Sequence, residues 1–244
     1  MITIALDAMG GDHAPTEVVR GAFLAAKEYP IKIILVGKKD SVEKELTKIN
    51  GALNHPQLQI QHASEVVEMG ESPAQSFKKK PNSSIRIGLN LVKEKKADAF
   101  VSAGNTGAVM AASTLILGRI KNIDRPAIAT IIQVYKHPFI MLDMGSNVDS
   151  KPKFLLQFAI MGSLFYELIF KKKNPRVGLL NIGEEPEKGN ALVQATYELL
   201  KNSNLNFIGN IESKAALYNK ADVVVCDGFV GNNLLKFGEG VVGL

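Results

Sequence analysis

Short apolar runs alternate along this chain with segments of helical period. Five of these runs end directly in a cluster of Gly, Asn, Asp or Ser, and they lie at residues 4–6, 99–101, 140–142, 177–180 and 223–225. Such alternation is typical of βαβ units around a mostly parallel sheet. Ligands of these sheets bind beyond the carboxyl ends of the strands, where loops and helix N-termini present free N–H groups. The pattern therefore predicts an α/β fold with one ligand site built from five loops.

The segments between these runs predict further helices and strands. A helix begins at Pro15 and Thr16 and stops before Pro30. Other predicted elements are strands at 31–36 and 58–62 and helices at 41–46 and 85–92, the last capped by Asn82 or Ser83. Residues 127–134 and 139–142 are joined by a short connection at 135–138, which favours an antiparallel hairpin. We therefore expect a mixed, mostly parallel sheet.

One segment, residues 153–170, is apolar over most of its length and is followed by three lysines. It falls short of the roughly 20 residues that span a bilayer, and it carries Gln157 and Glu167. A buried helix or a subunit-interface helix is the preferred interpretation. Attachment to a membrane surface through the lysines is the alternative.

Composition narrows the class of protein. The chain has 244 residues, 46% of them hydrophobic, which is enough for a substantial core, and we expect one α/β domain over 1–244. Residues 233–244 have the pattern of a helix that has just begun, so we also expect a C-terminal portion to be missing. The single cysteine excludes an internal disulfide, and the N-terminus lacks the pattern of a signal peptide, which together predict a cytosolic protein.

The net charge of +5 favours phosphates, an acidic protein partner or an anionic membrane surface. Nucleic acid is not an expected partner, because only 7% of the residues are aromatic and they are not interleaved with the basic ones. The four histidines and one cysteine show no metal-ligand spacing, so no metal is expected.

Two segments carry the chemistry of an anion site. Gly104, Asn105 and Thr106 lie between a strand and an apolar helix, where glycines allow close approach and the helix N-terminus offers N–H groups. Ser83 and Ser84 cluster with Lys79 and Lys80 at the start of another predicted helix. The alternatives are a turn needed only for packing and a solvated basic loop in front of a capped helix.

Other polar residues after the strands are candidates for acid–base chemistry or ligand contact. Asp12 and His13 put a carboxylate beside an imidazole, although Asp12 as a helix cap is an equal interpretation. Asn147 and Asn232 could each stabilise a turn or contact a ligand. Lys188 could contact an anionic group or lie in a solvated loop. The remaining candidates of this kind are Asp143, Asp227 and Asn233. Cys226 is preferred as a small buried residue over a nucleophile.

Several of these motifs resemble those of the bacterial phosphate acyltransferase (PlsX) family of phospholipid synthesis. They are DAMGGDHAP at 7–15, VSAGNTGA at 101–108, DRPA at 124–127, QFAIMG at 157–162, LLNIGEE at 179–185 and DGFVGN at 227–232. The resemblance implies transfer of a long acyl chain from acyl carrier protein to inorganic phosphate, without a cofactor. It also implies the α/β/α sandwich shared with isocitrate and isopropylmalate dehydrogenases and with phosphotransacetylases.

The resemblance further implies a homodimer in the cytoplasm or at the inner face of the cell membrane, with the membrane glycerol-3-phosphate acyltransferase as a further partner. Phosphate is itself the nucleophile in this reaction, so the protein has to supply an anion cradle and a means of polarising the thioester carbonyl. A site rich in Gly, Asn and Ser meets that need without a catalytic triad.

On this basis we assign roles to the candidate residues. The phosphate group is assigned to Gly104, Asn105, Thr106, Ser83 and Ser84. Asp12 and His13 are expected to orient the nucleophile or to take its proton. Asn147 or Asn232 is expected to donate to the developing oxyanion, and Lys188 to steer the phosphopantetheine arm.

Three other functions remain open on the sequence. A phosphotransacetylase-like enzyme acting on acyl-coenzyme A would share the phosphate cradle. A nicotinamide-dependent dehydrogenase would share the fold and add a nucleotide-binding loop and a carboxylate metal site. A non-catalytic scaffold would bind carrier protein without releasing its thiol.

Overall fold

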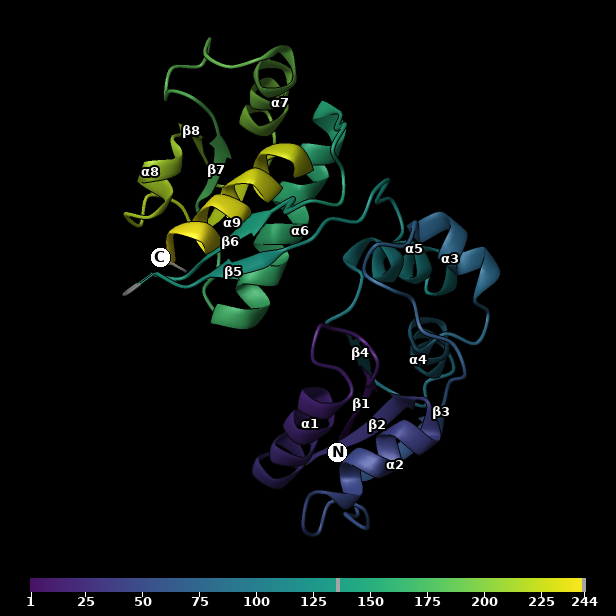
Figure 1. The fold of residues 1–244 in the computed structure, drawn as a ribbon. Coiled ribbons are helices and arrows are strands. Elements are labelled where there is room, and N and C mark those ends of the chain that lie inside the picture. The colour runs from purple at the N-terminus through teal and green to yellow at the C-terminus, as the bar shows by residue number, and fades with distance from the viewer. Residues whose placement is uncertain (135–136, 243–244) are drawn as a thin grey trace. The chain divides into compact units, whose positions relative to one another are not determined.

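The computed structural model describes residues 1–134 and 137–242, and its helices and strands alternate along most of the chain (Figure 1). In chain order they are β1 (Ile2–Asp7), α1 (Thr16–Glu28), β2 (Ile31–Gly37), α2 (Lys39–Thr47), β3 (Leu58–His62), α3 (Pro73–Lys79), α4 (Ser84–Lys93), β4 (Ala99–Val101), α5 (Thr106–Ile116), β5 (Thr130–Ile132), β6 (Phe139–Leu142), α6 (Pro152–Phe170), β7 (Val177–Leu180), α7 (Ala191–Lys201), β8 (Phe207–Ile211), α8 (Ser213–Ala216), β9 (Val223–Val225) and α9 (Gly228–Val242).

The chain forms two compact units, Met1–Gly118 and Arg119–Leu244, and each has its own sheet. The first sheet has the order β3-β2-β1-β4 and is parallel throughout. The second has the order β5-β6-β9-β7-β8, and only β5 runs antiparallel to its neighbour among the described strands. The predicted mixed, mostly parallel character is confirmed for the second sheet. The prediction of one sheet is wrong, because β4 pairs with β1 and the chain then continues through α5 to a separate set of strands. The prediction of one domain over 1–244 stays a prediction.

Helices cover both faces of the first sheet. Alternate residues of β2 point to opposite faces, as the period of a strand requires. Ile33 and Leu35 belong to a cluster with buried residues of α1 and α2, whereas Ile34 and Val36 pack with residues of α4. The buried positions of α1 recur at helical spacing and are Val19, Ala22, Phe23 and Ala26.

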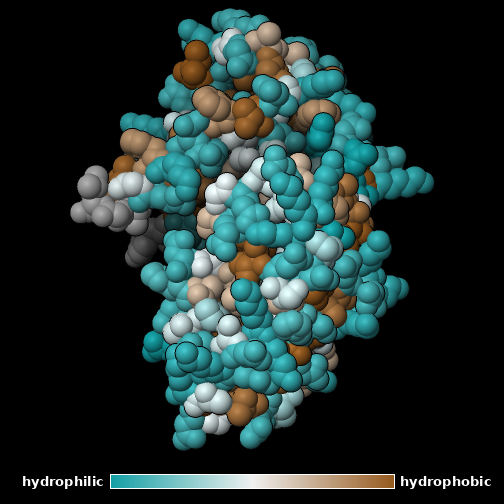
Figure 2. Space-filling view, turned by 45° about the vertical axis from the view of Figure 1, so that its right-hand side comes forward, coloured by the Kyte–Doolittle hydropathy of each residue, from teal (hydrophilic) through white to brown (hydrophobic). Residues whose placement is uncertain are grey.

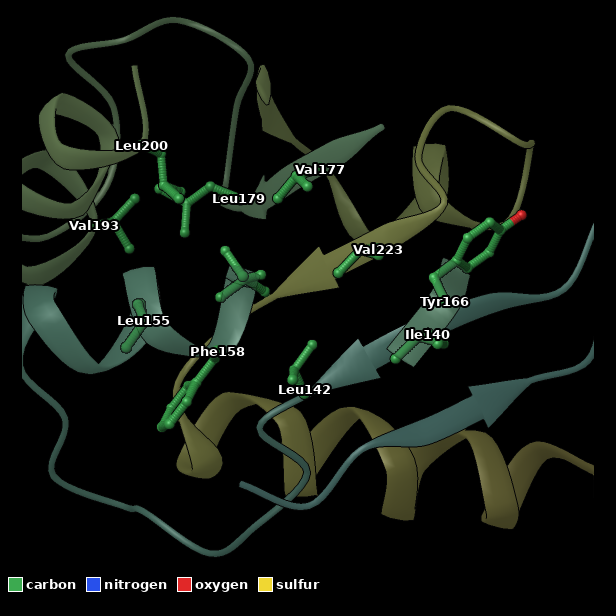
Figure 3. Close-up of a cluster of buried hydrophobic side chains, with 12 residues drawn as sticks. Ile140, Leu142, Leu155, Phe158, Tyr166, Val177, Leu179, Val193, Leu200 and Val223 are labelled. Carbon is green, nitrogen blue, oxygen red and sulfur yellow. The ribbon is translucent and has the colours of Figure 1, made fainter. Parts of the chain in front are cut away.

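The second sheet is also covered on both faces. Ile140, Val177 and Val223 pack against α6 and α7 in the cluster drawn in Figure 3. Met141 and Val224 face the other way, into a cluster with residues of α8 and α9. Each unit is thus an α/β structure with helices on both sides of its sheet.

Most predicted elements are confirmed, and Ser83 is the cap of α4. The antiparallel pairing of β5 with β6 is confirmed as well, although β5 spans only Thr130–Ile132 and the connection predicted at 135–138 lies partly outside the described residues, which omit 135 and 136. Helix α3 is absent from the sequence prediction because its polar sequence carries no apolar period. Pro73 at its first position was the available signal, since proline is favoured there.

Helix α6 is long and apolar enough to cross a membrane by length and composition alone. Its inner face packs on the sheet: a Cβ on Gly162 would lie 2.7 Å from Val223 Cγ1 and 2.8 Å from Leu142 Cδ2. The prediction of a buried helix is confirmed for this face. Ile160, Leu164 and Leu168 are exposed on the other face, and a role for them in a subunit interface stays a prediction. Figure 2 shows one side of the molecule, on which hydrophobic residues form separate patches within a largely hydrophilic surface.

Candidate functional site

In the first unit, the loops that follow β1 and β4 lie against each other. Ser102 Oγ donates to Asp7 Oδ2 at 2.7 Å and accepts from Gly104 N at 3.1 Å. A Cβ on Gly10 would lie 2.6 Å from Asp7 Oδ2 and 2.8 Å from Gly104 N, so only glycine allows this approach. The buried Asp7 and its partner Ser102 hold the two loops together. This pair is not among the site residues predicted from the sequence. The signal in the sequence was that Asp7 and Ser102 each stand where an apolar run ends.

Asn105 caps α5 and anchors a second loop. Its Oδ1 accepts from Ala108 N at 2.9 Å, and its Nδ2 donates to the carbonyl oxygens of Glu68, Met69 and Glu71 at 3.3, 2.9 and 3.0 Å. The side chain is buried and its hydrogen-bonding groups are occupied within the protein. An anion at this helix N-terminus would therefore meet backbone N–H groups and the exposed side chain of Thr106.

Ser83 and Ser84 are almost completely buried at the start of α4, which packs against α5. Ser83 Oγ accepts from Arg86 N at 3.4 Å, and Ser84 N donates to Glu65 O at 3.2 Å. The hydroxyl of Ser83 is thus used as a cap. The assignment of both serines to phosphate stays a prediction.

Of Lys79 and Lys80, the two lysines assigned to this cluster, Lys80 is neutralised locally. Its Nζ donates to Val66 O at 2.6 Å and forms an ion pair with Glu71. The hydrogen bond from Lys80 lowers the pKa of the Glu71 carboxyl. Lys79 is exposed.

Asp12 and His13 lie exposed in the loop between β1 and α1. Helix α1 has no side-chain cap, so the interpretation of Asp12 as its cap is wrong; the carbonyl of His13 instead accepts from Glu17 N at 3.1 Å. Both side chains are accessible to a ligand. Their role in proton transfer stays a prediction.

In the second unit, the completely buried carboxylate of Asp143 organises the loop after β6. Oδ1 accepts from the backbone N of Ile128, Gly145 and Ser146 at 3.0, 3.2 and 3.0 Å. Oδ2 accepts from the backbone N and the Nδ2 of Asn147 at 2.7 and 2.8 Å. The carboxylate therefore fixes a complete turn of polar backbone beyond the strand.

The two asparagines proposed as oxyanion donors differ in their surroundings. Asn147 Nδ2 donates to Asp143 Oδ2, to Pro126 O at 2.8 Å and to Ser146 Oγ at 2.9 Å, so its protons are occupied. Asn232 is exposed on α9 beside Gly145, and within the described chain its amide has no hydrogen-bond partner. Asn232 is therefore the better placed of the two for contact with a ligand.

The loop after β9 joins the same cluster. Gly228 N donates to Asn147 O at 2.8 Å, and Asp227 Oδ1 accepts from Val230 N at 2.9 Å in the first turn of α9. A Cβ on Gly231 would lie 2.0 Å from Asp143 O. The loops after β6 and β9 are thus in direct backbone contact.

Lys188 is exposed in the loop after β7. Its carbonyl accepts from Asn181 Nδ2 at 3.1 Å, and its backbone N donates to Glu185 O at 3.1 Å, which leaves the ammonium group in solvent. A steering role for this group stays a prediction.

Cys226 lies at the end of β9 and is almost completely buried. Its Sγ donates to Asp143 O at 3.6 Å. Burial raises the pKa of the Cys226 thiol, and the nearby carboxylates of Asp227 and Asp143 raise it further. A thiol in this environment is not a nucleophile near neutral pH, which agrees with the preferred interpretation of this residue.

A pocket of about 400 Å³ opens at the carboxyl ends of β7 and β9. It is lined by Leu155, Leu179, Leu180, Asn181, Ile182, Gly189, Asn190, Val193, Ser213, Cys226, Asp227, Val230 and Leu234. All of these residues belong to the second unit.

Of the five predicted loops, those after β1 and β4 lie together in the first unit. Those after β6 and β9 lie together in the second unit, and the loop after β7 contributes to the pocket there. A single site built from all five stays a prediction. Across residues 1–134 and 137–242, no group of three His, Cys, Asp or Glu side chains is arranged to hold a metal ion.

Comparison with known proteins places the chain in a family. Residues 2–244 match the family described as "Fatty acid synthesis protein". A phosphate acyltransferase of Heliobacterium modesticaldum is 55% identical over 98% of this chain and 71% of its own length. The chain belongs to the phosphate acyltransferase family. A second member, from Desulfitobacterium hafniense, is 53% identical over the whole chain and 72% of its own length.

Solved structures show a likeness of fold beyond this family. A phosphotransacetylase from Streptococcus pyogenes has a TM-score of 0.74 at 18% identity, covering 98% of this chain and 82% of that one. A 4-hydroxythreonine-4-phosphate dehydrogenase from Burkholderia phymatum has a TM-score of 0.51 at 12% identity, covering 92% and 79%. This chain thus shares an α/β fold with mostly parallel sheets with both kinds of enzyme. Its high identity to phosphate acyltransferases over nearly its whole length makes it an enzyme of that type.

Proposed function

We propose that this enzyme transfers a long-chain acyl group from acyl carrier protein to inorganic phosphate, giving an acyl phosphate for phospholipid synthesis. The observation that carries the proposal is the start of α5, where Gly10 and Gly104 bring two loops together beside a helix N-terminus. Such a site attracts an oxyanion through backbone N–H groups and the helix dipole. The relatives are phosphate acyltransferases, which supports the same choice of substrate.

In the proposed reaction, phosphate replaces a protein nucleophile. A phosphate oxygen forms a bond to the thioester carbonyl carbon, the C–S bond breaks, and the sulfur leaves with the electron pair and takes up a proton. The protein has to hold phosphate in line with the carbonyl and to donate hydrogen bonds to the developing oxyanion. The buried Cys226 thiol has no part in this sequence of steps.

The local contacts decide how we distribute the roles. We assign phosphate to the backbone of Gly104 and to Thr106, and make Asn105 a positioning residue because its side chain is occupied. The buried Ser83 and Ser84 support the same helix end from α4.

The remaining roles follow exposure. Asp12 and His13 orient or deprotonate the phosphate nucleophile, and Asn232 donates to the oxyanion. Asn147 acts through Asp143 as a positioning residue. Lys188 attracts the anionic phosphopantetheine arm of the carrier protein.

The proposal extends to the protein's assembly and place in the cell. We infer a homodimer in the cytoplasm that associates with the inner face of the membrane, with the membrane glycerol-3-phosphate acyltransferase as the enzyme that receives the product. The net charge of +5 suits both an acidic carrier protein and an anionic surface. We also infer that the fold is a variant of the sandwich of isocitrate and isopropylmalate dehydrogenases.

The fold likeness to phosphotransacetylases keeps acyl-coenzyme A as a second candidate donor. The test is release of free thiol from palmitoyl acyl carrier protein and from palmitoyl-coenzyme A, each with and without inorganic phosphate. We expect phosphate-dependent release from the carrier protein. Release mainly from the coenzyme A thioester would replace the proposal by the second candidate, and tight binding of the carrier protein with no thiol release would replace it by a scaffold.

A further inference from the structure

We propose that the pocket at the carboxyl ends of β7 and β9 binds the hydrocarbon chain of the acyl donor. This inference rests on the proposed function and adds a location for the part of the substrate that does not react. The pocket lies wholly within the second unit, so its shape is given by the packing of that unit alone.

The floor of the pocket is apolar and comes from three elements and the loop after β9. Leu155 of α6, Leu179 of β7 and Val193 of α7 are members of the buried cluster drawn in Figure 3. Cys226 follows β9 and belongs to the cluster on the other face of the sheet. These side chains are between 0% and 9% exposed, so they form a fixed surface that belongs to the core. Val230 and Leu234 of α9, one helical turn apart, form a wall.

The volume of the pocket admits a hydrocarbon chain, and the charge of its lining favours such a chain over a polar ligand. About 400 Å³ lies within the range of small-molecule sites. Asp227 is the only charged residue of the lining, and its Oδ1 is occupied by the backbone N of Val230 at 2.9 Å. No cation of the lining would hold a phosphate or a carboxylate, whereas every buried methylene would gain from leaving water.

Apart from Val230 of the wall, the exposed part of the lining forms the rim, which carries no charge and is polar except for Ile182. Asn181, Asn190 and Ser213 stand at the edge of the pocket, and Asn190 Oδ1 caps α7 through Val193 N at 3.0 Å. A neutral thioester and the amides of a pantetheine arm match such a rim, while the hydrocarbon chain matches the floor. The gradient from polar rim to apolar floor is the arrangement that an acyl thioester requires.

Val230→Trp tests the proposal by narrowing the pocket from its wall. Val230 is 38% exposed, so the larger ring does not overpack the core, and Val241→Trp on the same helix is the matched control because Val241 is 55% exposed and outside the lining. We expect Val230→Trp to lower kcat/KM for palmitoyl donors by about tenfold or more and to change hexanoyl donors by less than about threefold, since pockets discriminate chains methylene by methylene. The hexanoyl donor also controls for disturbance of the nearby Asn232. An equal loss with both donors, or no loss with either, would overturn the inference.

Binding of a fluorescent polyene fatty acid, measured without phosphate or donor, gives a readout that does not depend on turnover. We expect about tenfold weaker binding to Val230→Trp and unchanged binding to Val241→Trp, with Val193→Phe as a second pocket variant if the first does not fold. Unchanged fatty-acid binding in both pocket variants would contradict the inference even in an active enzyme. The opposite outcome is also distinguishable. If the parent protein transfers no acyl group but binds the fatty acid, and the pocket variants weaken that binding, the pocket inference holds and the proposed function fails.

Discussion

Asn147 donates two hydrogen bonds to one oxygen of Asp143, through its backbone N at 2.7 Å and its side-chain Nδ2 at 2.8 Å. The carboxylate is completely buried, and both residues follow the same strand, β6. Because the amide also reaches Pro126 O, it links the loop after β6 to the segment that precedes β5. A side chain with these contacts acts on the site by holding the backbone in place.

Asn147→Ala and Asn232→Ala should therefore behave differently. The first leaves a buried carboxylate short of a donor, and we expect a loss of about 1–3 kcal/mol in the free energy of unfolding. The second alters an exposed side chain, so we expect less than about 0.5 kcal/mol. If Asn232 donates to the oxyanion, its removal lowers kcat by about a hundredfold or more. Denaturant unfolding and thiol-release kinetics measure both quantities, and normal turnover of Asn232→Ala would contradict its assignment.

Gly10→Ala should separate the loops after β1 and β4. The new methyl would lie 2.6 Å from Asp7 Oδ2 and 2.8 Å from Gly104 N, so the loops must move by a few tenths of an ångström or more. Displacement of a positioning element on this scale costs about tenfold or more in kcat/KM. Gly21→Ala is the control, because a Cβ there meets nothing within 4 Å in the interior of α1. We expect the control to keep its activity and to gain about 0.5–1 kcal/mol in stability; normal activity of Gly10→Ala would show that the close contact has no role in catalysis.

Asn105→Ala should lower turnover by more than about tenfold while the protein remains folded, since the loss of a helix cap costs about 1 kcal/mol. The variant Asn105→Asp separates the two functions of the side chain. It keeps an acceptor for Ala108 N but loses the donor to the carbonyls of Glu68, Met69 and Glu71. If Asn105→Asp restores stability and leaves turnover low, the residue acts through the loop and not only as a cap. Near-normal turnover of Asn105→Ala would remove it from the site.

Asp222 should make the stability of the second unit depend on pH. Burial raises the pKa of its carboxyl, but hydrogen bonds from Arg176 N and Nε, at 2.8 and 2.9 Å, and from Lys172 outweigh burial, so the pKa in the folded protein lies well below the ordinary 3.8. A group with a lowered pKa stabilises the fold above its unfolded pKa and ceases to do so as the pH falls through its folded pKa. We therefore expect this stabilisation to be complete above about pH 5 and to decline below about pH 4.

Asp222→Asn removes the charge and leaves Arg176 facing a neutral amide. We expect a loss of about 3 kcal/mol at neutral pH, at the lower end for a buried pair because Arg176 and Lys172 are partly exposed. The difference between the variant and the parent should shrink as the pH falls below about 4. Urea unfolding at a series of pH values measures this, and a difference that stays constant down to about pH 2 would contradict the account of Asp222.

Cys226→Ala should leave transfer to phosphate largely intact. The thiol is buried and its raised pKa keeps it protonated, so we expect turnover within about threefold of the parent. Loss of a covalent nucleophile would instead reduce kcat by several orders of magnitude. A fall of that size, with the fold preserved, would restore the covalent mechanism.

Local features of the fold could be read from the sequence because they depend on neighbours along the chain. The period of apolar residues predicts α1 and β2, and Ser83 in front of an apolar run predicts the cap of α4. Clusters of Gly and Asn after apolar runs correctly mark the ends of strands. In the same way, the motifs from Asp7 to Asn232 determine the family, since their order and spacing are properties of the sequence itself.

Contacts between distant segments were decided only by the tertiary structure. Nothing in the sequence around Asn105 shows that its amide turns toward the carbonyls of Glu68, Met69 and Glu71, and the spacing of Asp222 and Arg176 gives no sign of their ion pair. The sequence also contains no sign that the strands divide into two sheets. Nor does it show that α6, α7, α9 and two strand ends line one pocket. The physical reason is that the free energy of such contacts depends on which surfaces packing brings together, whereas strand period, caps and turns depend on the backbone conformation of a few consecutive residues.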